Sequence, residues 1–496
     1  MALTDGIAGH PEQGMSAPDA RAAAQGGASL LVLQTIGRLL GLLFVVIVTR
    51  HLPPDQFGRY STVAAVVLLG NFLADFGTSA AITRLVSRSP EDADELLSGT
   101  LLGSLGLGLL SYAGVLVFAT VSYSSTTAVD MAIGALAIPC AAMLSSLLGA
   151  LDGKGMIARR ASISALQTFT VAAGAVPVLF GAGVRSALVA MALAPMICLL
   201  LAGGTAYRAG AWSWPLRLDP KQSLALLRTA APYGLTGGLA ALTMRFDVVL
   251  LSLVSSAAET ARYDLALRLL EACTYLSTAF SGPLLFLLSR RLGSGDRDGA
   301  QRAFTEAVRL LYLLGLPLSM GLALLARPFV SIALGAEFSS AALPLAIMGA
   351  AQWVTWLICT QSALVMAGDS MRQAVRIGLW IAAATVVLDL CLVPPFGATG
   401  AAIAMVVSWA FSAVILHQFA RRTTGVATVL PSARVVIPTV CMGVVVAGLR
   451  GYPLLVPVVA GILTYALGVS LSRAFTPTDF QRLLRLVRRR PATAPS

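Results

Sequence analysis

Four arginines lie inside apolar stretches of the chain: Arg38, Arg245, Arg268 and Arg309. A guanidinium at the centre of a lipid bilayer costs about 2.5–3.5 kcal/mol on insertion scales, so each needs a partner or a function. A guanidinium binds the oxygens of phosphate and carboxylate groups through two parallel hydrogen bonds. These arginines therefore predict that an anion is bound inside a membrane.

Arg38 is the deepest of the four. It lies near the middle of the apolar stretch 28–49, roughly 15 Å from either surface at ~1.5 Å per residue. Gln34 precedes it by one helical turn and Gly41 follows three residues later, which predicts a polar face with room beside it. Arg38 and Gln34 are therefore candidates for lining a binding cavity. The alternative is a structural ion pair between Arg38 and a neighbouring carboxylate.

Two further arginines have carboxylates nearby in the sequence. Arg245 precedes Asp247 by two residues, so the two side chains point about 200° apart on a helix. Arg268 follows Asp264 by four residues and precedes Glu271 by three, which places all three on one face. Arg245 and Arg268 are candidates for the cavity, whereas Asp247 and Glu271 are candidates for charge pairing or ion coupling. Simple charge satisfaction within the Asp264, Arg268 and Glu271 group remains the alternative.

Three other charged residues are placed by their depth. Asp75 lies inside its apolar stretch with Asn71 one turn before it, so it either couples transport to an ion or pairs with an arginine. Asp389 is expected near the membrane interface. Arg309 lies close to the start of its stretch and is expected to extend toward the cytosol.

The composition identifies the elements that must position these residues. Of 496 residues, 57% are hydrophobic and only 12% are charged, against ~25% charged in soluble domains. This excludes an ordinary soluble protein and a disordered one. At ~20 apolar residues per transmembrane helix, the chain predicts an all-α, polytopic membrane protein with about 14 transmembrane helices. The expected spans are 28–49, 59–82, 97–121, 129–151, 161–181, 185–207, 227–253, 263–288, 306–326, 343–366, 373–393, 399–420, 434–450 and 453–472.

Basic residues give the orientation of these spans. With the N-terminus inside, 25 of the 35 lysines and arginines fall on the inner side and 6 on the outer side. Cytoplasmic loops carry such an excess, so both termini are expected in the cytoplasm. The arginines separate apolar stretches and do not cluster into a basic patch, so a nucleic-acid-binding protein is not expected. The outer loops are short, which leaves no room for the catalytic loop of a membrane glycosyltransferase or polymerase.

The two halves of the sequence contain an internal repeat. Gly58-Arg59-Tyr60 in the first half matches Ala261-Arg262-Tyr263 in the second, 203 residues later. The repeat predicts two six-helix lobes followed by two extra helices. The expected domains are a disordered cytosolic tail (1–27), an N-lobe (28–207), a cytosolic linker (208–226), a C-lobe (227–420), two extra spans (421–472) and a basic amphipathic cytosolic tail (473–496).

Several of these motifs resemble a known family. They are Ile36-Gly-Arg38, Pro53-Pro-Asp-Gln-Phe57-Gly58-Arg-Tyr60, Ala74-Asp75-Phe-Gly77 and Tyr263-Asp-Leu-Ala-Leu-Arg268. Together they resemble the polysaccharide-biosynthesis, or lipid-linked oligosaccharide, flippases of the multidrug/oligosaccharidyl-lipid/polysaccharide (MOP) superfamily, over roughly residues 28–420. The resemblance implies two six-helix lobes around a central cavity. It also implies translocation of a polyprenyl-diphosphate-linked oligosaccharide from the inner to the outer leaflet of a bacterial inner (plasma) membrane, for surface polysaccharide synthesis.

The expected partners are the lipid-linked oligosaccharide and membrane lipids, together with a glycan polymerase or glycosyltransferases. No cofactor and no enzymatic activity are expected, and H+, Na+ and the membrane potential are the candidate driving forces. Three alternatives stay open: a flippase for a peptidoglycan lipid precursor, a cation-coupled multidrug exporter of the same superfamily, and a membrane glycosyltransferase or polymerase. An exporter of cations would favour aromatic residues, which make up only 7% of this chain.

Overall fold

The computed structural model describes residues 36–37, 39–210, 220–368 and 371–472. These residues form α-helices and short 3₁₀-helices, and this part of the chain contains no strand. The expectation of an all-α protein is therefore confirmed. The predicted tails, 1–27 and 473–496, and most of the predicted linker lie outside the described residues.

The helices of the first half begin after the helix Leu39–His51. They are α2 (Pro54–Asp75), α3 (Thr78–Arg88), α4 (Ala93–Ser122), α5 (Ser125–Ala135), α6 (Ala137–Gly153), α7 (Ile157–Ala173), α8 (Ala175–Leu179) and α9 (Val184–Arg208). The second half comprises α10 (Pro220–Val254), α11 (Ala257–Gly293), α12 (Arg297–Leu334), α13 (Ala342–Ala350), α14 (Gln352–Ala367), α15 (Met371–Thr424), α16 (Ala433–Gly448) and α17 (Leu455–Leu471).

These helices make a multi-pass membrane protein. Eight helices of the described chain are long and apolar enough to cross a membrane, and a ninth span results if α13 and α14, bent by 45° at their junction, are counted as one. The 54-residue α15 contains a break at Gly397, whose φ of 55° and ψ of −135° suit only glycine. The preceding Pro394 and Pro395 help to end the first segment of α15. The total of about 14 transmembrane helices stays a prediction.

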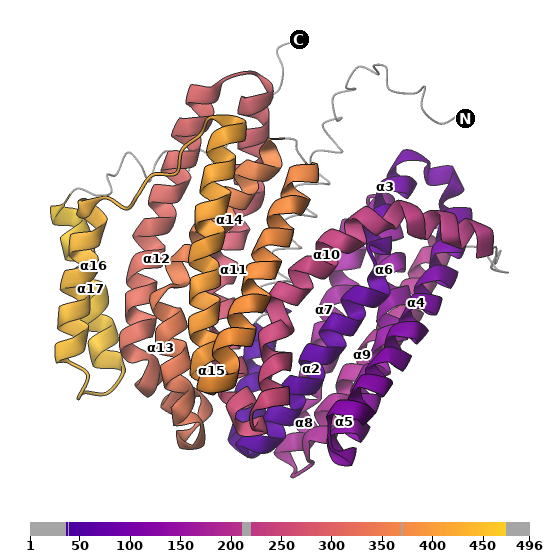
Figure 1. Cartoon of the computed structure of the whole chain (residues 1–496), viewed down its shortest axis with the longest axis horizontal. Coiled ribbons are helices and arrows are strands. Elements are labelled where there is room, and N and C mark those ends of the chain that lie inside the picture. The colour runs from indigo at the N-terminus through magenta and orange to yellow at the C-terminus, as the bar shows by residue number, and fades with distance from the viewer. Residues whose placement is uncertain (1–35, 38, 211–219, 369–370, 473–496) are drawn as a thin grey trace.

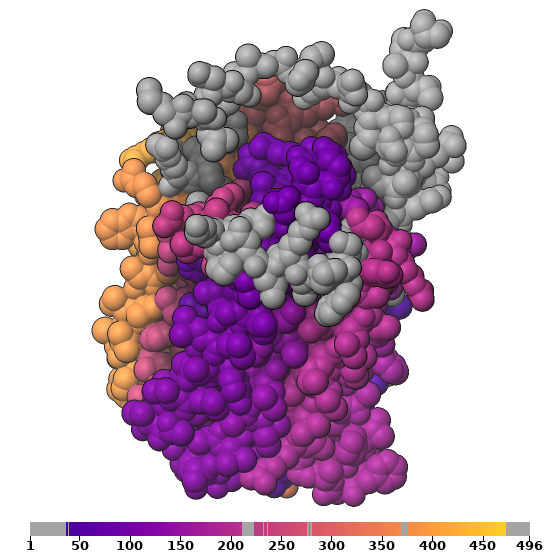
Figure 2. Space-filling view, turned by 90° about the vertical axis from the view of Figure 1, so that its right-hand side faces the viewer, coloured from indigo at the N-terminus to yellow at the C-terminus, as the bar shows by residue number. Residues whose placement is uncertain are grey.

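The two halves of the chain occupy separate parts of the molecule (Figure 1). In that view α2–α9 form the right-hand part, whereas α11–α15 form the left-hand part, with α16 and α17 packed on α12 at the far left edge. Figure 2 shows the right-hand face, where the described surface is made mainly by the first half of the chain. Each half therefore has its own bundle of helices.

Helix α10 contacts both bundles. Near its start, the Ser223 hydroxyl donates to the Gly99 carbonyl at 2.8 Å, and the Tyr233 hydroxyl accepts from Arg84 at 2.7 Å. Further along, α10 packs against α15 and α11. The helix begins at Pro220, within the predicted linker, because proline lacks the N–H that a first helical position leaves unpaired. The predicted boundary between the linker and the C-lobe, at residue 227, therefore falls inside a single helix that contacts both bundles.

The close contact between the halves is made by α2 and α11. These helices begin at Pro54 and Ala257, 203 residues apart, so Tyr60 and Tyr263 occupy the same position along their helices. A Cβ atom on Gly58 would lie 1.8 Å from the carbonyl oxygen of Ala257, so only glycine permits this approach.

Two further contacts join the halves at the same end of the molecule. The Phe57 ring packs edge-on against Phe338 of the 3₁₀-helix Ala336–Ala341, with centroids 6.2 Å apart. The hydroxyls of Tyr123 and Ser252 lie 2.6 Å apart. The halves are thus joined by packing and hydrogen bonding where α2 and α11 begin.

Replacing Gly58 with alanine is expected to separate α2 from α11, because the new methyl group would overlap backbone atoms that cannot rotate away. We expect a loss of about 1–3 kcal/mol, the usual range for overpacking a core. Thermal unfolding of the purified protein in detergent measures this loss.

Gly114→Ala is the matched control. This glycine lies in the interior of α4 and a Cβ there would have no atom within 4 Å, so alanine should stabilise the helix by up to ~1 kcal/mol. Equal stability of the two variants would contradict the contact described at Gly58.

Candidate functional site

Four charged residues meet between the last third of α10 and the first half of α11. Arg245 comes from α10, and Asp264, Arg268 and Glu271 come from α11. The three α11 residues are spaced by four and three positions, which places them on one face of the helix. They lie about 10, 16 and 21 Å along α11 from its first residue, well inside a hydrocarbon core of ~30 Å. We call these four residues the charge cluster.

The charge cluster forms a continuous chain of ion pairs. The Nε atom of Arg268 donates to Oδ2 of Asp264 at 2.6 Å, and Oδ1 of Asp264 lies 3.6 Å from Nη1 of Arg245. The Nη2 atom of Arg245 donates to Oε1 and Oε2 of Glu271, at 2.8 and 3.2 Å. The predicted pairing of Asp264 with Arg268 is thus present. Glu271, however, binds Arg245 of the neighbouring helix instead of Arg268, because α10 brings that guanidinium between the two carboxylates.

The members of the cluster differ in how far they are buried. The side chain of Asp264 is 1% exposed, that of Arg245 12%, that of Arg268 22% and that of Glu271 27%. The guanidinium of Arg268 also lies 5.7 Å from the centre of the Tyr60 ring, at cation–π distance. Since Tyr60 belongs to α2, the cluster lies at the contact between the two halves. Arg268 and Glu271 are the partly exposed members of the cluster.

A second group of acidic residues lies close by. Asp247 is buried and accepts hydrogen bonds from the Tyr263 hydroxyl and, at 2.7 Å, from the backbone N–H of Val248. Its partners differ from those of Arg245, as expected for two side chains on different faces of α10. Asp389 of α15 is near enough for its charge to interact with Asp247.

Asp389 is buried by its neighbours. The residue is 1% exposed, and its Oδ2 atom has no hydrogen-bond partner within the described residues. Its expected place near the membrane interface stays a prediction. In the structure α15 packs along α10, which covers this carboxylate.

Asp75 lies at the break between α2 and α3. Its Oδ1 atom accepts from the Ser145 hydroxyl at 2.6 Å, and its Oδ2 atom accepts from the backbone N–H of Gly77 at 3.2 Å. No ion pair to Asp75 is found among the residues that the structure describes. Phe76 and Gly77 both have a positive φ, so the carboxylate stabilises a strained turn.

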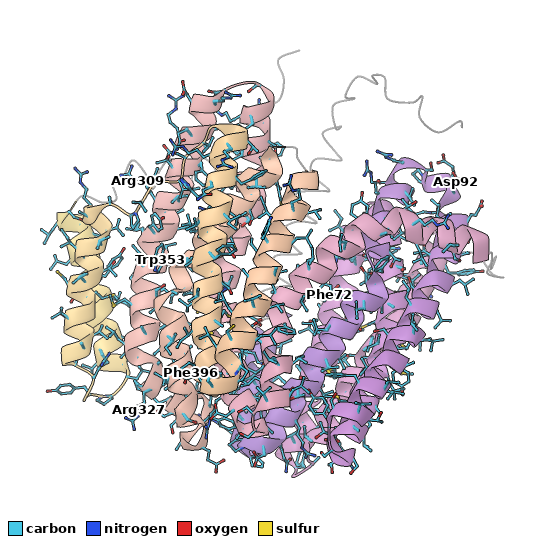
Figure 3. The ribbon with its side chains drawn as sticks, viewed as in Figure 1. Phe72, Asp92, Arg309, Arg327, Trp353 and Phe396 are labelled. Atoms are coloured by element: carbon cyan, nitrogen blue, oxygen red, sulfur yellow. The ribbon has the colours of Figure 1, made fainter. Side chains whose placement is uncertain are left out.

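The remaining predicted residues are placed as follows. Arg38 and Gln34 lie outside the described residues. Arg309 is exposed on α12, and Figure 3 shows it toward the same end of the molecule as Asp92, with Arg327 and Phe396 toward the opposite end. The position of Arg309 agrees with a side chain near one membrane surface.

One buried carboxylate, that of Asp130, was not predicted from the sequence. Asp130 of α5 has a fully buried side chain and pairs with Arg59 of α2 at 3.1 Å and with Arg185 of α9 at 3.0 Å. A carboxylate at the start of an apolar stretch, opposite two arginines in short outer loops, was the available signal. The group joins three helices of the first half. Within the described residues, no three histidine, cysteine or acidic side chains form a metal site.

Comparison with known proteins gives two family matches. Residues 23–285 match the family model described as "Polysaccharide biosynthesis protein", and residues 161–464 match the model described as "Lipid II flippase MurJ". A curated relative from Haloferax volcanii is named "Probable low-salt glycan biosynthesis flippase Agl15". It is 21% identical over 483 residues, which cover 94% of this chain and 99% of the relative.

Solved structures of two kinds share the fold. A lipid II flippase MurJ in an inward closed conformation superposes with a TM-score of 0.75 at 14% identity, covering 92% of this chain and 99% of that one. An inward-facing multidrug resistance MATE family transporter superposes with a TM-score of 0.63 at 15% identity, covering 78% and 94%. At these identities the likeness establishes the fold alone. With more than half of its residues matched by the first family model, the chain belongs to the polysaccharide biosynthesis protein family.

Proposed function

We propose that this protein moves a polyprenyl-diphosphate-linked oligosaccharide from the inner to the outer leaflet of the membrane, for surface polysaccharide synthesis, and catalyses no reaction. The observation that carries the proposal is the charge cluster, which holds two arginines at mid-membrane depth where the two halves of the chain meet. The family match and the relative named a glycan biosynthesis flippase support the same class of cargo.

The chemistry of the cargo explains why arginines are needed. A diphosphate loses its hydration on entering hydrocarbon, which is prohibitive without replacement partners. Arg245 and Arg268 can replace water with charge-assisted, two-pronged hydrogen bonds. The lipid tail can stay in the bilayer while the diphosphate and the sugars pass between the halves.

A peptidoglycan lipid precursor is the second candidate cargo. The match of residues 161–464 to the lipid II flippase model favours it. Its diphosphate would make the same contacts, so the two candidates differ in the sugar portion alone.

Arg268→Ala is expected to reduce export of the cell-surface glycan by about 10- to 100-fold, the range that corresponds to one lost hydrogen bond between charged groups. Arg268→Lys should restore part of the export, because lysine keeps the charge and loses the planar fork. Arg38→Ala should cause the same loss. Surface glycan per cell, corrected for the amount of inserted protein, measures these effects.

Arg309→Ala serves as the control, since this arginine is exposed on α12 and lies outside the charge cluster. In a deletion strain, the lipid-linked oligosaccharide should accumulate facing the cytosol. A strain that made no lipid-linked unit would instead indicate a synthase. Normal glycan export together with sensitivity to cationic dyes would indicate a drug exporter.

We further propose that the protein resides in a bacterial inner membrane with both termini in the cytoplasm, and that a glycan polymerase or glycosyltransferases work beside it. The bias of 25 inner to 6 outer basic residues supports the orientation. Ser124, between α4 and α5, and Ser294, between α11 and α12, are both exposed, and the turns that contain them lie at opposite ends of the molecule (Figure 1).

Single cysteines at these two positions test the orientation. In a variant whose six native cysteines are replaced, an impermeant thiol reagent applied to intact cells should label Ser124→Cys and leave Ser294→Cys unlabelled. After the cells are opened, both should react. The reverse pattern in intact cells would overturn the orientation.

We also propose that transport is driven by H+ or Na+ bound at Asp247 and Asp389. The unpartnered, buried Oδ2 atom of Asp389 supports this proposal, because an isolated carboxylate in a membrane is stable only with a proton or a cation. Asp75 and Glu271 are the less favoured sites, since hydroxyl and backbone donors satisfy the first and Arg245 satisfies the second. Asp247 has similar donors, the Tyr263 hydroxyl and the Val248 N–H, but its carboxylate also lies near that of Asp389.

Asp389→Asn is expected to abolish the dependence of transport on an imposed H+ or Na+ gradient, while binding of the cargo persists. Transport of a fluorescent polyprenyl diphosphate into proteoliposomes, with and without each gradient, measures the change. Asp298→Asn, an exposed acid in the first turn of α12, is the control. Gradient dependence that survives in Asp389→Asn would overturn Asp389 as the coupling site, and transport by the unmodified protein that depends on neither gradient would leave the membrane potential as the driving force.

A further inference from the structure

The two carboxylates of the charge cluster hold the same arginine but are not equivalent. Asp264 is 1% exposed and contacts both Arg268 and Arg245. Glu271 is 27% exposed and, among the described residues, pairs with Arg245, with both of its oxygens near one nitrogen. Asp264 thus lies between two guanidinium groups, whereas Glu271 pairs with one of them and can be replaced there by another anion.

The charges of the cluster cancel. Two guanidinium groups and two carboxylates give no net charge, so the described cluster offers little attraction for an anion as it stands. A diphosphate therefore competes with the two carboxylates for the arginines. Displacing Asp264 would leave an unpaired charge in a buried site, which is strongly unfavourable. Displacing Glu271 moves a carboxylate that is already 27% exposed and that pairs with one arginine among the described residues.

The exchange can take place at the Nη2 atom of Arg245, which donates to both oxygens of Glu271. The Nη1 atom is buried, lies 3.6 Å from Oδ1 of Asp264 and makes no hydrogen bond to any described residue. An incoming phosphate oxygen could take the place of a Glu271 oxygen at Nη2, with the guanidinium left in position by Asp264. The exchange then needs a rearrangement of Glu271 alone.

We propose that Glu271 is a displaceable counter-ion, which occupies Arg245 in the empty protein and gives way to the diphosphate of the cargo. This inference rests on the proposed function. Asp264 is then a positioning residue that keeps both arginines oriented throughout. The return of Glu271 to Arg245 displaces the diphosphate, so the same carboxylate opposes binding and promotes release.

Binding of geranylgeranyl diphosphate to the full chain in detergent, followed by tryptophan fluorescence, tests the inference. Glu271→Gln should bind the probe about tenfold more tightly, because it removes a competitor for Arg245 and a negative charge beside the diphosphate. Glu306→Gln, which removes an exposed carboxylate from α12 outside the cluster, should bind like the unmodified protein. Geranylgeraniol, which has the same tail without phosphate, should not distinguish Glu271→Gln from the unmodified protein.

Two further readouts separate exchange from a purely structural role. Glu271→Gln should retain its thermal stability and export less glycan, with more lipid-linked cargo copurifying because release is slowed. Asp264→Asn should instead lower the melting temperature and fail to tighten binding, because it leaves two arginines without their buried partner.

The outcomes distinguish this inference from the proposed function. Unchanged or weaker binding of the probe by Glu271→Gln would overturn the displaceable counter-ion, even with the proposed function intact. Undiminished binding by both Arg245→Ala and Arg268→Ala would overturn the use of this cluster for a diphosphate, and the counter-ion with it. Tighter binding by Glu271→Gln together with lost binding by Arg245→Ala supports both.

Discussion

The high cost of an unpaired charge in hydrocarbon constrains the centre of this protein. Two arginines lie there, and each must face a carboxylate in the absence of an anionic ligand. Asp264 meets this requirement for both at once, which fixes the relative position of α10 and α11. The adjacent Asp247 and Tyr263 join the same two helices through a buried hydrogen bond. The register of these helices is thus set by electrostatics as well as by packing.

Packing between the halves places this cluster at their contact. The missing side chain of Gly58 lets α2 meet the first residue of α11, and two residues further along α2 the Tyr60 ring lies by Arg268. The motif of Phe57, Gly58 and Tyr60 therefore serves a structural purpose as a unit. Each member touches the second half of the chain through a different kind of interaction.

The helical membrane fold could be predicted from the sequence because hydrophobic stretches and the positions of arginines reflect the bilayer directly. The same reasoning singled out Arg245 and Arg268 as arginines within apolar stretches. It also predicted the pair of Arg268 with Asp264, since these two residues lie one turn apart on the same helix. It missed the pair of Arg245 with Glu271, the burial of Asp389 and the group around Asp130. Each of these depends on which helices become neighbours, and periodicity within one helix carries no information about that.

Helices α16 and α17 are unusually short for their surroundings. With 16 and 17 residues they extend about 24–26 Å, whereas the hydrocarbon core of a typical bilayer is about 30 Å thick. Such a mismatch is accommodated by local thinning of the bilayer or by flanking side chains that reach outward, at a modest cost per ångström. If both helices cross the membrane, one of these two adjustments takes place beside α12, along one flank of the protein.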